Sequence, residues 1–253
     1  MHIPPVLRRM ISESPVSNIR VRIRCGPAKG ARWTLFPFSM YWRSGGESEV
    51  ATAAALVPHL EGASFWDFGA HFGIHAVAMA FKVGSTGEVA AFEPDPFSFS
   101  KLSRHVSLNR LQNVRCFRAA ASNHLGAGEI IDCGIGAPTQ HFAYPDGGGL
   151  RDRSQPFFVV QTVRADDLVA NREIRLPDLI KVDVEGHGGA AIEGSALSIA
   201  HRRPVIVMSS HSRMETLGTR HVLEPLGYQV HAMDGAALSW DELTYHTQLL
   251  LPT

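Results

Sequence analysis

Short apolar runs alternate with longer amphipathic stretches over most of the chain. From residue 64 onward, the apolar runs predict strands over residues 64–68, 88–93, 114–119, 178–184 and 204–209. Strands that alternate with helices of about ten to fifteen residues indicate βαβ units and a mostly parallel sheet. Ligands of such sheets bind outside the carboxyl ends of the strands, so residues at those ends are the first candidates for function.

The chain before residue 47 does not follow this alternation. Two strand-like runs flank Gly26-Pro27, which predicts a hairpin turned at this dipeptide. We therefore expect a strand and loop extension over residues 1–46 and one α/β domain over residues 47–253. Helices are also expected over 47–60, 73–82, 96–109, 187–200 and 213–226, and strands over 128–133, 157–163, 228–232 and 245–251. Asp95 is the expected N-cap of the helix over 96–109.

One long segment, residues 134–156, is dense in glycine and proline. A loop of this length inside a compact domain is usually functional or disordered. We expect a mobile loop over the ligand-binding side of the domain, where Phe142 and Tyr144 could stack on a ring of a bound molecule.

Composition narrows the functional classes. The 253 residues carry 24 basic and 24 acidic side chains, and this zero net charge argues against a general nucleic-acid binder. No apolar run approaches the length of about 20 residues that spans a bilayer. The 3 widely spaced cysteines form neither a disulfide framework nor a metal-binding pair. We expect a cytoplasmic protein that acts on a small molecule, with no nucleic-acid or membrane partner.

A glycine turn follows the strand over residues 64–68. Gly69 permits a turn with positive φ, and Gly73 lets the next helix begin close to the sheet. Free N–H groups at that helix start would favour a polar or negatively charged ligand group. Asp67, at the strand end, could meet an ammonium or ribose group. The alternative is an ordinary turn that needs two glycines for packing.

Glu93 ends the next strand, 20 residues after Gly73. An acid at about this offset is placed to accept hydrogen bonds from a ribose diol. Pro94 and Pro96 favour a rigid bend there, although a surface glutamate before a proline turn would give the same pattern. The turn lacks the G-x-G-x-x-G pattern, which disfavours a nucleotide-dependent oxidoreductase.

Three motifs in order narrow the prediction further. D-F-G-A-H-F-G over residues 67–73, A-F-E-P-D-P over 91–96 and I-K-V-D-V-E-G-H over 180–187 resemble the FkbM family of methyltransferases. The resemblance implies a Rossmann-like class I methyltransferase fold, a mostly parallel seven-stranded sheet with helices on both faces. It also implies methyl transfer from S-adenosylmethionine, usually to a hydroxyl on a sugar or natural product.

The resemblance also implies roles for individual residues. Asp183 would face the methyl group and the acceptor, Glu93 would hold the ribose and Ala120 would lie beside the adenine. The cofactor-binding residues that it implies are Asp67, Gly69, Ala70, His71, Gly73, Glu93, Pro94, Ala120 and Asp183.

The chain departs from the family pattern at the acceptor side. Gly188 and Ser209 stand where the family commonly has glutamate, and His71 stands where it commonly has asparagine. Two missing carboxylates leave open a second class of function, a binding module that keeps the cofactor cleft without turnover. An RNA methyltransferase is disfavoured by the zero net charge.

Methyl transfer to a hydroxyl requires removal of a proton. His187 and His211 both follow strand ends, so either could be the base. Asp183 could orient that histidine, bind the cofactor ammonium or be a base itself. We expect His187 at the open edge of the cleft, where the dipole of the following helix would lower its pKa. Asp183 and Glu185 alternate along a strand and should face opposite sides, so we expect no metal ion.

Overall fold

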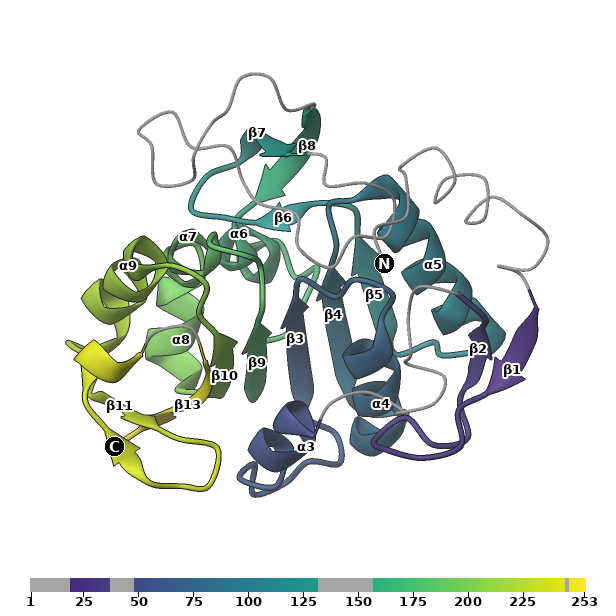
Figure 1. Cartoon of the computed structure of the whole chain (residues 1–253), viewed down its shortest axis with the longest axis horizontal. Coiled ribbons are helices and arrows are strands. Elements are labelled where there is room, and N and C mark those ends of the chain that lie inside the picture. Colours follow the sequence, from purple (N-terminus) through teal and green to yellow (C-terminus); the bar gives the residue numbers. More distant parts are fainter. Residues whose placement is uncertain (1–18, 37–47, 132–156, 244–245) are drawn as a thin grey trace, which may run out of the picture.

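The computed structural model describes residues 19–36, 48–131, 157–243 and 246–253. Its central feature is a sheet in which five neighbouring strands are parallel, from β10 to β5, and β13 runs antiparallel to its neighbours (Figure 1). In spatial order the strands are β12 (Ala237–Leu238), β11 (Tyr228–His231), β13 (Thr247–Pro252), β10 (Val205–Ser209), β9 (Leu179–Val182), β3 (Ser64–Phe68), β4 (Glu88–Phe92) and β5 (Val114–Phe117). The mostly parallel sheet is confirmed, with the two-residue β12 added at the edge of the seven strands expected.

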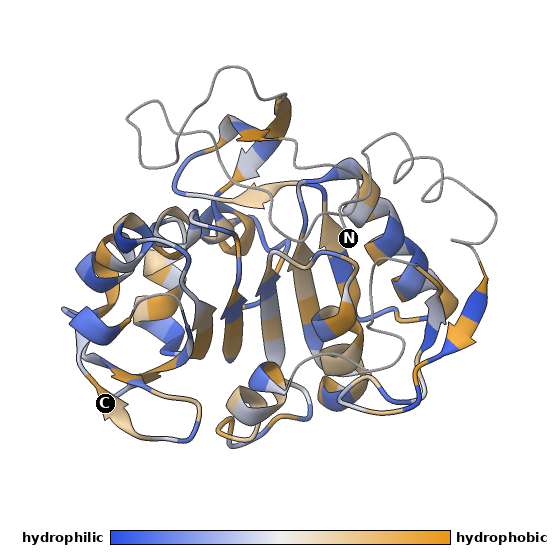
Figure 2. Cartoon of the chain, in the orientation of Figure 1, coloured by the Kyte–Doolittle hydropathy of each residue, from blue (hydrophilic) through white to orange (hydrophobic). Residues whose placement is uncertain are grey.

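Helices cover both faces of this sheet, as expected. One apolar cluster joins Phe65 to α3 (Glu49–Ala54), α4 (Ile74–Val83) and α5 (Pro96–Leu108). The other joins Trp66 and Phe68 to α6 (Ala165–Ala170), α7 (Gly188–Glu193), α8 (Ala196–Arg202) and α9 (Arg213–Leu223). Successive side chains of a strand point to opposite faces, so all five residues of β3 are buried between two helical layers. Figure 2 shows apolar residues along these strands and hydrophilic residues on the outer sides of the helices.

Three predicted elements are shorter or divided. The helix expected over 47–60 ends at Ala54, because Pro58 has no N–H to continue the hydrogen-bond ladder. The helix expected over 187–200 is two helices, α7 and α8, that meet at Gly194, where a side chain would overlap with the carbonyl oxygen of Ser122. The strand expected over 178–184 ends at Val182. Every helix in the described ranges is too short or too polar to cross a bilayer.

A smaller sheet lies at the carboxyl ends of the central strands (Figure 1). Its strands are β6 (Ala120–Ala121), β8 (Phe157–Val163) and β7 (Gly126–Ile131), in that order. β6 follows β5 directly, which is why this sheet lies over the edge where ligands of parallel sheets bind. The expected loop over 134–156 lies outside the described residues.

The predicted N-terminal hairpin is present as β1 (Arg20–Arg22) and β2 (Arg32–Thr34). Trp33 is 1% exposed and stacks on His105 of α5, with ring centroids 3.5 Å apart. The His105 ring accepts from the Thr34 amide at 3.1 Å through Nε2 and lies 2.8 Å from the carbonyl oxygen of Phe72 through Nδ1. The hairpin therefore packs into the same core as the helices. The boundary at residues 46 and 47 lies outside the described residues and stays a prediction.

Asn109, the C-cap of α5, ties the hairpin to this helix. Its Oδ1 accepts from the Arg32 amide at 2.7 Å, and its Nδ2 donates to the Arg32 and His105 carbonyls at 2.8 Å each. We predict that Asn109→Ala lowers the free energy of unfolding by about 1–3 kcal/mol, because two backbone groups of β2 lose their partners. Urea denaturation measures this change.

The matched control is Asn171→Ala. Asn171 is also a helix C-cap, on α6, but its side chain is exposed and only its backbone N–H makes a hydrogen bond in the structure. Its substitution should leave the denaturation midpoint close to that of the parent protein. Equal losses in the two variants would contradict a tie between the hairpin and α5.

Candidate active site

The turn from β3 into α4 requires its two glycines for packing. Gly69 and Gly73 have φ of +78° and +84°, so the predicted positive φ is confirmed. A side chain at Gly69 would overlap with the Asp183 carbonyl oxygen, and one at Gly73 would overlap with Leu102. A Gly69→Val substitution would therefore damage the contact between β3 and β9, and it cannot serve as a clean probe of ligand binding.

The amides of this turn are used inside the protein. Gly69 and Ala70 both donate to the carbonyl oxygen of Phe92, at 3.1 and 2.9 Å, and His71 donates to Glu93 Oε2 at 2.7 Å. These three N–H groups therefore have partners inside the protein and are not free to bind a ligand. The turn is instead fastened to the end of β4.

Glu93 is buried, with 7% of its surface exposed. Its Oε1 accepts from the Asp95 amide at 2.9 Å and its Oε2 from the His71 amide. Burial raises the pKa of Glu93 to about 8. An ionised carboxylate offers about four acceptor sites, so sites remain beside the two amides. The neighbouring Pro94 is partly exposed, and Asp95 caps α5 as predicted by accepting from Ser98 at 2.7 Å.

Lys181 connects the two sides of the site. Its Nζ donates to the Gly69 carbonyl oxygen at 2.9 Å and lies 3.4 Å from Asp67 Oδ1 and 3.8 Å from Asp183 Oδ2. Asp67 is fully buried, so the ammonium group that it meets belongs to the protein and not to a ligand. Burial raises the pKa of Asp67, and Lys181 opposes this rise.

The sequence interpretation missed Lys181, although the pattern held a signal. Asp67 and Lys181 are direct partners in the parallel pairing of β3 with β9. Their side chains therefore reach the same height on the same face. Recognising this from the sequence would have required the strand order and register.

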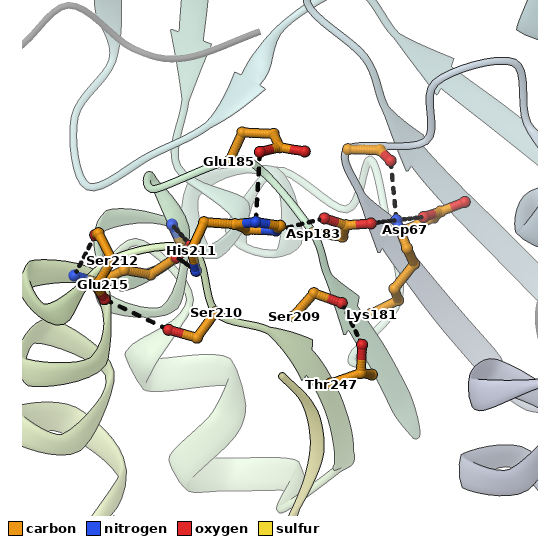
Figure 3. Close-up of polar contacts among 12 residues, drawn as sticks. Asp67, Lys181, Asp183, Glu185, Ser209, Ser210, His211, Ser212, Glu215 and Thr247 are labelled. Carbon is orange, nitrogen blue, oxygen red and sulfur yellow. Dashed lines mark hydrogen bonds and ion pairs between the residues drawn. The ribbon is translucent and has the colours of Figure 1, made fainter. Parts of the chain in front are cut away.

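Three side chains converge beyond the end of β9 (Figure 3). The Nε2 of His211 lies 2.9 Å from Asp183 Oδ1, and its Nδ1 lies 3.4 Å from Glu185 Oε2. The expectation that Asp183 and Glu185 face opposite sides is wrong, because β9 ends at Val182 and Glu185 has a φ of +51°. The chain turns there, and both carboxylates face the imidazole of His211.

Electrostatics couples this cluster to Lys181. Burial opposes ionisation of Asp183, but Lys181 and His211 outweigh it and hold the pKa of Asp183 at about 2. The hydrogen bond to Asp183 raises the pKa of His211, against the effect of partial burial. The side chains of His211 and Asp183 are 31% and 33% exposed, so the cluster is open to a ligand.

The predicted position of His187 at the open edge is wrong. This residue is 4% exposed, and its Nε2 lies 3.1 Å from the hydroxyl of Ser122. Burial lowers the pKa of His187 to about 3. His211 is the histidine that lies at the edge.

Gly188 is explained by Glu215, a buried residue that the sequence interpretation missed. Glu215 accepts from the amides of Gly188 at 2.7 Å and His211 at 2.6 Å. A side chain at position 188 would overlap with the Glu215 carboxylate. The signal for Glu215 was the capping pattern S-x-x-E at 212–215, and Ser212 does cap α9. A glutamate at 188 would therefore require Glu215 and Met208 to shift.

Two other predicted positions lie nearby. The hydroxyl of Ser209, at the end of β10, is 2.9 Å from that of Thr247 on β13. Ala120 is 5% exposed on β6, paired with Thr162 of β8. The structure thus brings Gly69, Glu93 and Asp183 to one edge of the sheet.

Comparisons with known proteins agree with this architecture. A family model described as the methyltransferase FkbM domain matches residues 67–230. The hexuronic acid methyltransferase AglP of Haloferax volcanii is 28% identical over 180 residues, which cover 70% of this chain and 69% of that protein. A crystal structure of methyltransferase FkbM from Methylobacillus flagellatus KT matches with a TM-score of 0.50 and 16% identity. That match covers 79% of this chain and 47% of the other, so this chain spans about half of its length.

The matched segment includes the glycine turn, Glu93 and the cluster around His211, and it makes up more than half of the chain. The expected class I fold, methyltransferase activity and S-adenosylmethionine cofactor are confirmed by these findings. The chain belongs to the FkbM methyltransferase family.

Proposed function

We propose that the chain methylates a hydroxyl group of a sugar, in the first place a hexuronic acid. The similarity to the hexuronic acid methyltransferase AglP carries the choice of acceptor. The open cluster of Asp183, Glu185 and His211 supports turnover, because it supplies carboxylates at the edge where Gly188 and Ser209 do not. The proposal includes a small-molecule acceptor and no nucleic-acid or membrane partner. It also includes a cytoplasmic location.

The residues at the cofactor side fit S-adenosylmethionine. Glu93 is a buried carboxylate at the end of β4 with acceptor sites left over by its two amide partners, as a ribose diol requires. Gly69, His71 and Pro94 are partly exposed beside it, and we assign them to the methionine and ribose parts. Ala120 of β6 is assigned to the adenine. When bound, S-adenosylmethionine supplies a methyl group on a positively charged sulfur.

The acceptor side must orient a hydroxyl and release its proton. Asp183 and His211 are exposed enough to contact the acceptor, and Lys181 keeps Asp183 ionised and in place. The oxygen of the acceptor forms a bond to the methyl carbon as the carbon–sulfur electron pair returns to sulfur, and the hydroxyl proton passes to the imidazole of His211. Asp67 is fully buried and contacts Lys181, so it is a positioning residue that acts through Lys181.

The function is tested by methyl transfer from radiolabelled S-adenosylmethionine to a pair of glycosides. The expected product is a methyl ether of a glucuronic acid glycoside, with slower transfer to the matched glucose glycoside. Calorimetric binding of S-adenosylhomocysteine is measured in parallel. Binding without transfer to either sugar would contradict the proposed acceptor and favour a binding module.

We predict that Glu93→Gln weakens binding of S-adenosylhomocysteine by about tenfold or more. The comparison is made above the Glu93 pKa of about 8, where the carboxylate is ionised. Hydrogen bonds to a charged group contribute about 1.5–3 kcal/mol, and about 1.4 kcal/mol corresponds to tenfold in affinity. Isothermal titration calorimetry measures the change. The control is Glu88→Gln at the opposite end of β4, where the carboxylate accepts from the Arg175 amide at 2.7 Å. If both variants bind like the parent, Glu93 does not hold the ribose.

The pKa of Glu93 also predicts how stability depends on pH. Its pKa is raised from 4.5 to about 8, so the folded state holds a proton that the unfolded state releases between these values. The free energy of unfolding should therefore fall as pH rises through this window, relative to the Glu93→Gln variant, in which position 93 does not titrate. Denaturation at intervals from pH 4.5 to 8 measures it. Parallel pH profiles for the two proteins would show that Glu93 is not protonated when folded.

Substitution of His211 should lower kcat, whereas substitution of His187 should lower stability. His211→Ala should leave stability and cofactor affinity near those of the parent and lower kcat by about 10²–10⁴. His187→Ala should instead lower the free energy of unfolding by about 1–3 kcal/mol, because the buried hydroxyl of Ser122 loses a partner. Denaturation and steady-state kinetics on both variants measure this contrast. If the His187→Ala protein folds and loses more kcat than the His211→Ala protein, His187 and not His211 is the base.

A further inference from the structure

The cluster of Asp183, Glu185 and His211 has the composition and spacing of a cation site. One ligand atom from each residue lies within 4.8 Å of the other two. Bonds from a divalent ion to oxygen or nitrogen are about 2.0–2.3 Å long, so small rotations of these partly exposed side chains would close the three around one ion. The residues come from three backbone segments: the end of β9, the turn after it, and the loop between β10 and α9 (Figure 3).

Charge in the cluster favours a cation over an anion or a neutral ligand. Two carboxylates face one imidazole, with both ring nitrogens of His211 directed at a carboxylate oxygen. Lys181 is the facing cation, but it contacts Oδ2 of Asp183 and is shared with Asp67. Oδ1 of Asp183 and Oε2 of Glu185 both face the His211 ring.

The backbone holds the ligands in this arrangement. Glu185 has a φ of +51°, in the left-handed region that residues with a side chain adopt rarely and most often at functional sites. The amide of His211 donates to the buried carboxylate of Glu215 at 2.6 Å, which fixes the loop that carries the imidazole. The backbone segments that carry Glu185 and His211 are therefore held in place before any ligand arrives, as binding sites require.

We propose that Asp183, Glu185 and His211 bind one divalent transition-metal cation, with Mn²⁺ preferred over Mg²⁺ and Ca²⁺. The imidazole ligand gives this preference, because Mg²⁺ and Ca²⁺ take oxygen ligands almost exclusively. With three protein ligands, the ion keeps open positions toward solvent, as metal ions that act on substrates do.

The role of the ion in catalysis rests on the proposed function. A divalent cation lowers the pKa of a coordinated hydroxyl. Because His211 is then a ligand of the ion, the hydroxyl proton passes to solvent water and not to His211, while the oxygen lone pair forms the new carbon–oxygen bond and the carbon–sulfur pair stays on sulfur. The ion would also let a negatively charged hexuronic acid approach two carboxylates that would otherwise repel it.

Metal binding is tested directly on the full chain. The protein is treated with EDTA, transferred to metal-free buffer and titrated with MnCl₂, and free Mn²⁺ is followed by electron paramagnetic resonance. One Mn²⁺ per chain is expected. Glu185→Gln and His211→Gln should each weaken binding by about 100-fold or more, since even groups that only orient a ligand are worth about 10–100-fold.

The control is Asp241→Asn, which removes a side chain 91% exposed and paired with Arg220, remote from the cluster. It should bind Mn²⁺ like the parent. Circular dichroism and binding of S-adenosylhomocysteine show whether each variant is folded. If one of the two cluster variants does not fold, the other alone tests the site. No stoichiometric binding up to about 1 mM MnCl₂, or equal binding by the parent and both cluster variants, would overturn the site.

Methyl transfer then separates the two proposals. Loss of transfer after EDTA and recovery with Mn²⁺, but not with Ca²⁺, would support the role in the reaction. Transfer that EDTA does not affect would overturn that role, even if Mn²⁺ binds. If Mn²⁺ binds at the cluster and no sugar is methylated with any metal, the site stands and the proposed function fails.

Discussion

The buried ammonium group of Lys181 is the interaction on which the site depends. It lies between Asp67 and Asp183 and donates to the carbonyl oxygen of Gly69. An isolated charge is costly to bury, so the lysine and the fully buried Asp67 each require the other. Because the same ammonium reaches the glycine turn, the position of the cofactor side and the ionisation of the acceptor side are set by one group.

This arrangement follows from the parallel sheet. β3 and β9 are neighbours although more than a hundred residues separate them, and their register places Asp67 opposite Lys181. The glycine at position 69 then allows the turn to lie against the Asp183 carbonyl oxygen. Strand order, register and one residue without a side chain together bring the two halves of the site into contact.

The sequence predicted the alternation of strands and helices because buried parallel strands are short, continuous apolar runs. It also predicted Asp95 as a helix cap and the positions of the glycine turn and Glu93. It did not predict the end of β9, since apolar periodicity continues through Val184 while the pairing stops at Val182. That difference of two residues reversed the expected orientation of Glu185. The position of His187 failed for a similar reason, because burial beneath Ser122 depends on packing between distant segments.

The hairpin described at the N-terminus has a consequence for where the catalytic unit begins. His105 is buried, and burial lowers its pKa to about 3, so its ring is neutral, with Nδ1 donating to the Phe72 carbonyl oxygen and Nε2 accepting from the amide of Thr34. Phe72 belongs to the glycine turn. The His105 ring, in this one tautomer, therefore connects β2 to the glycine turn. The family match begins at residue 67, but a fragment cut there would lack the partner of this ring. The smallest cooperative unit of the enzyme therefore extends upstream of the segment by which the family is recognised.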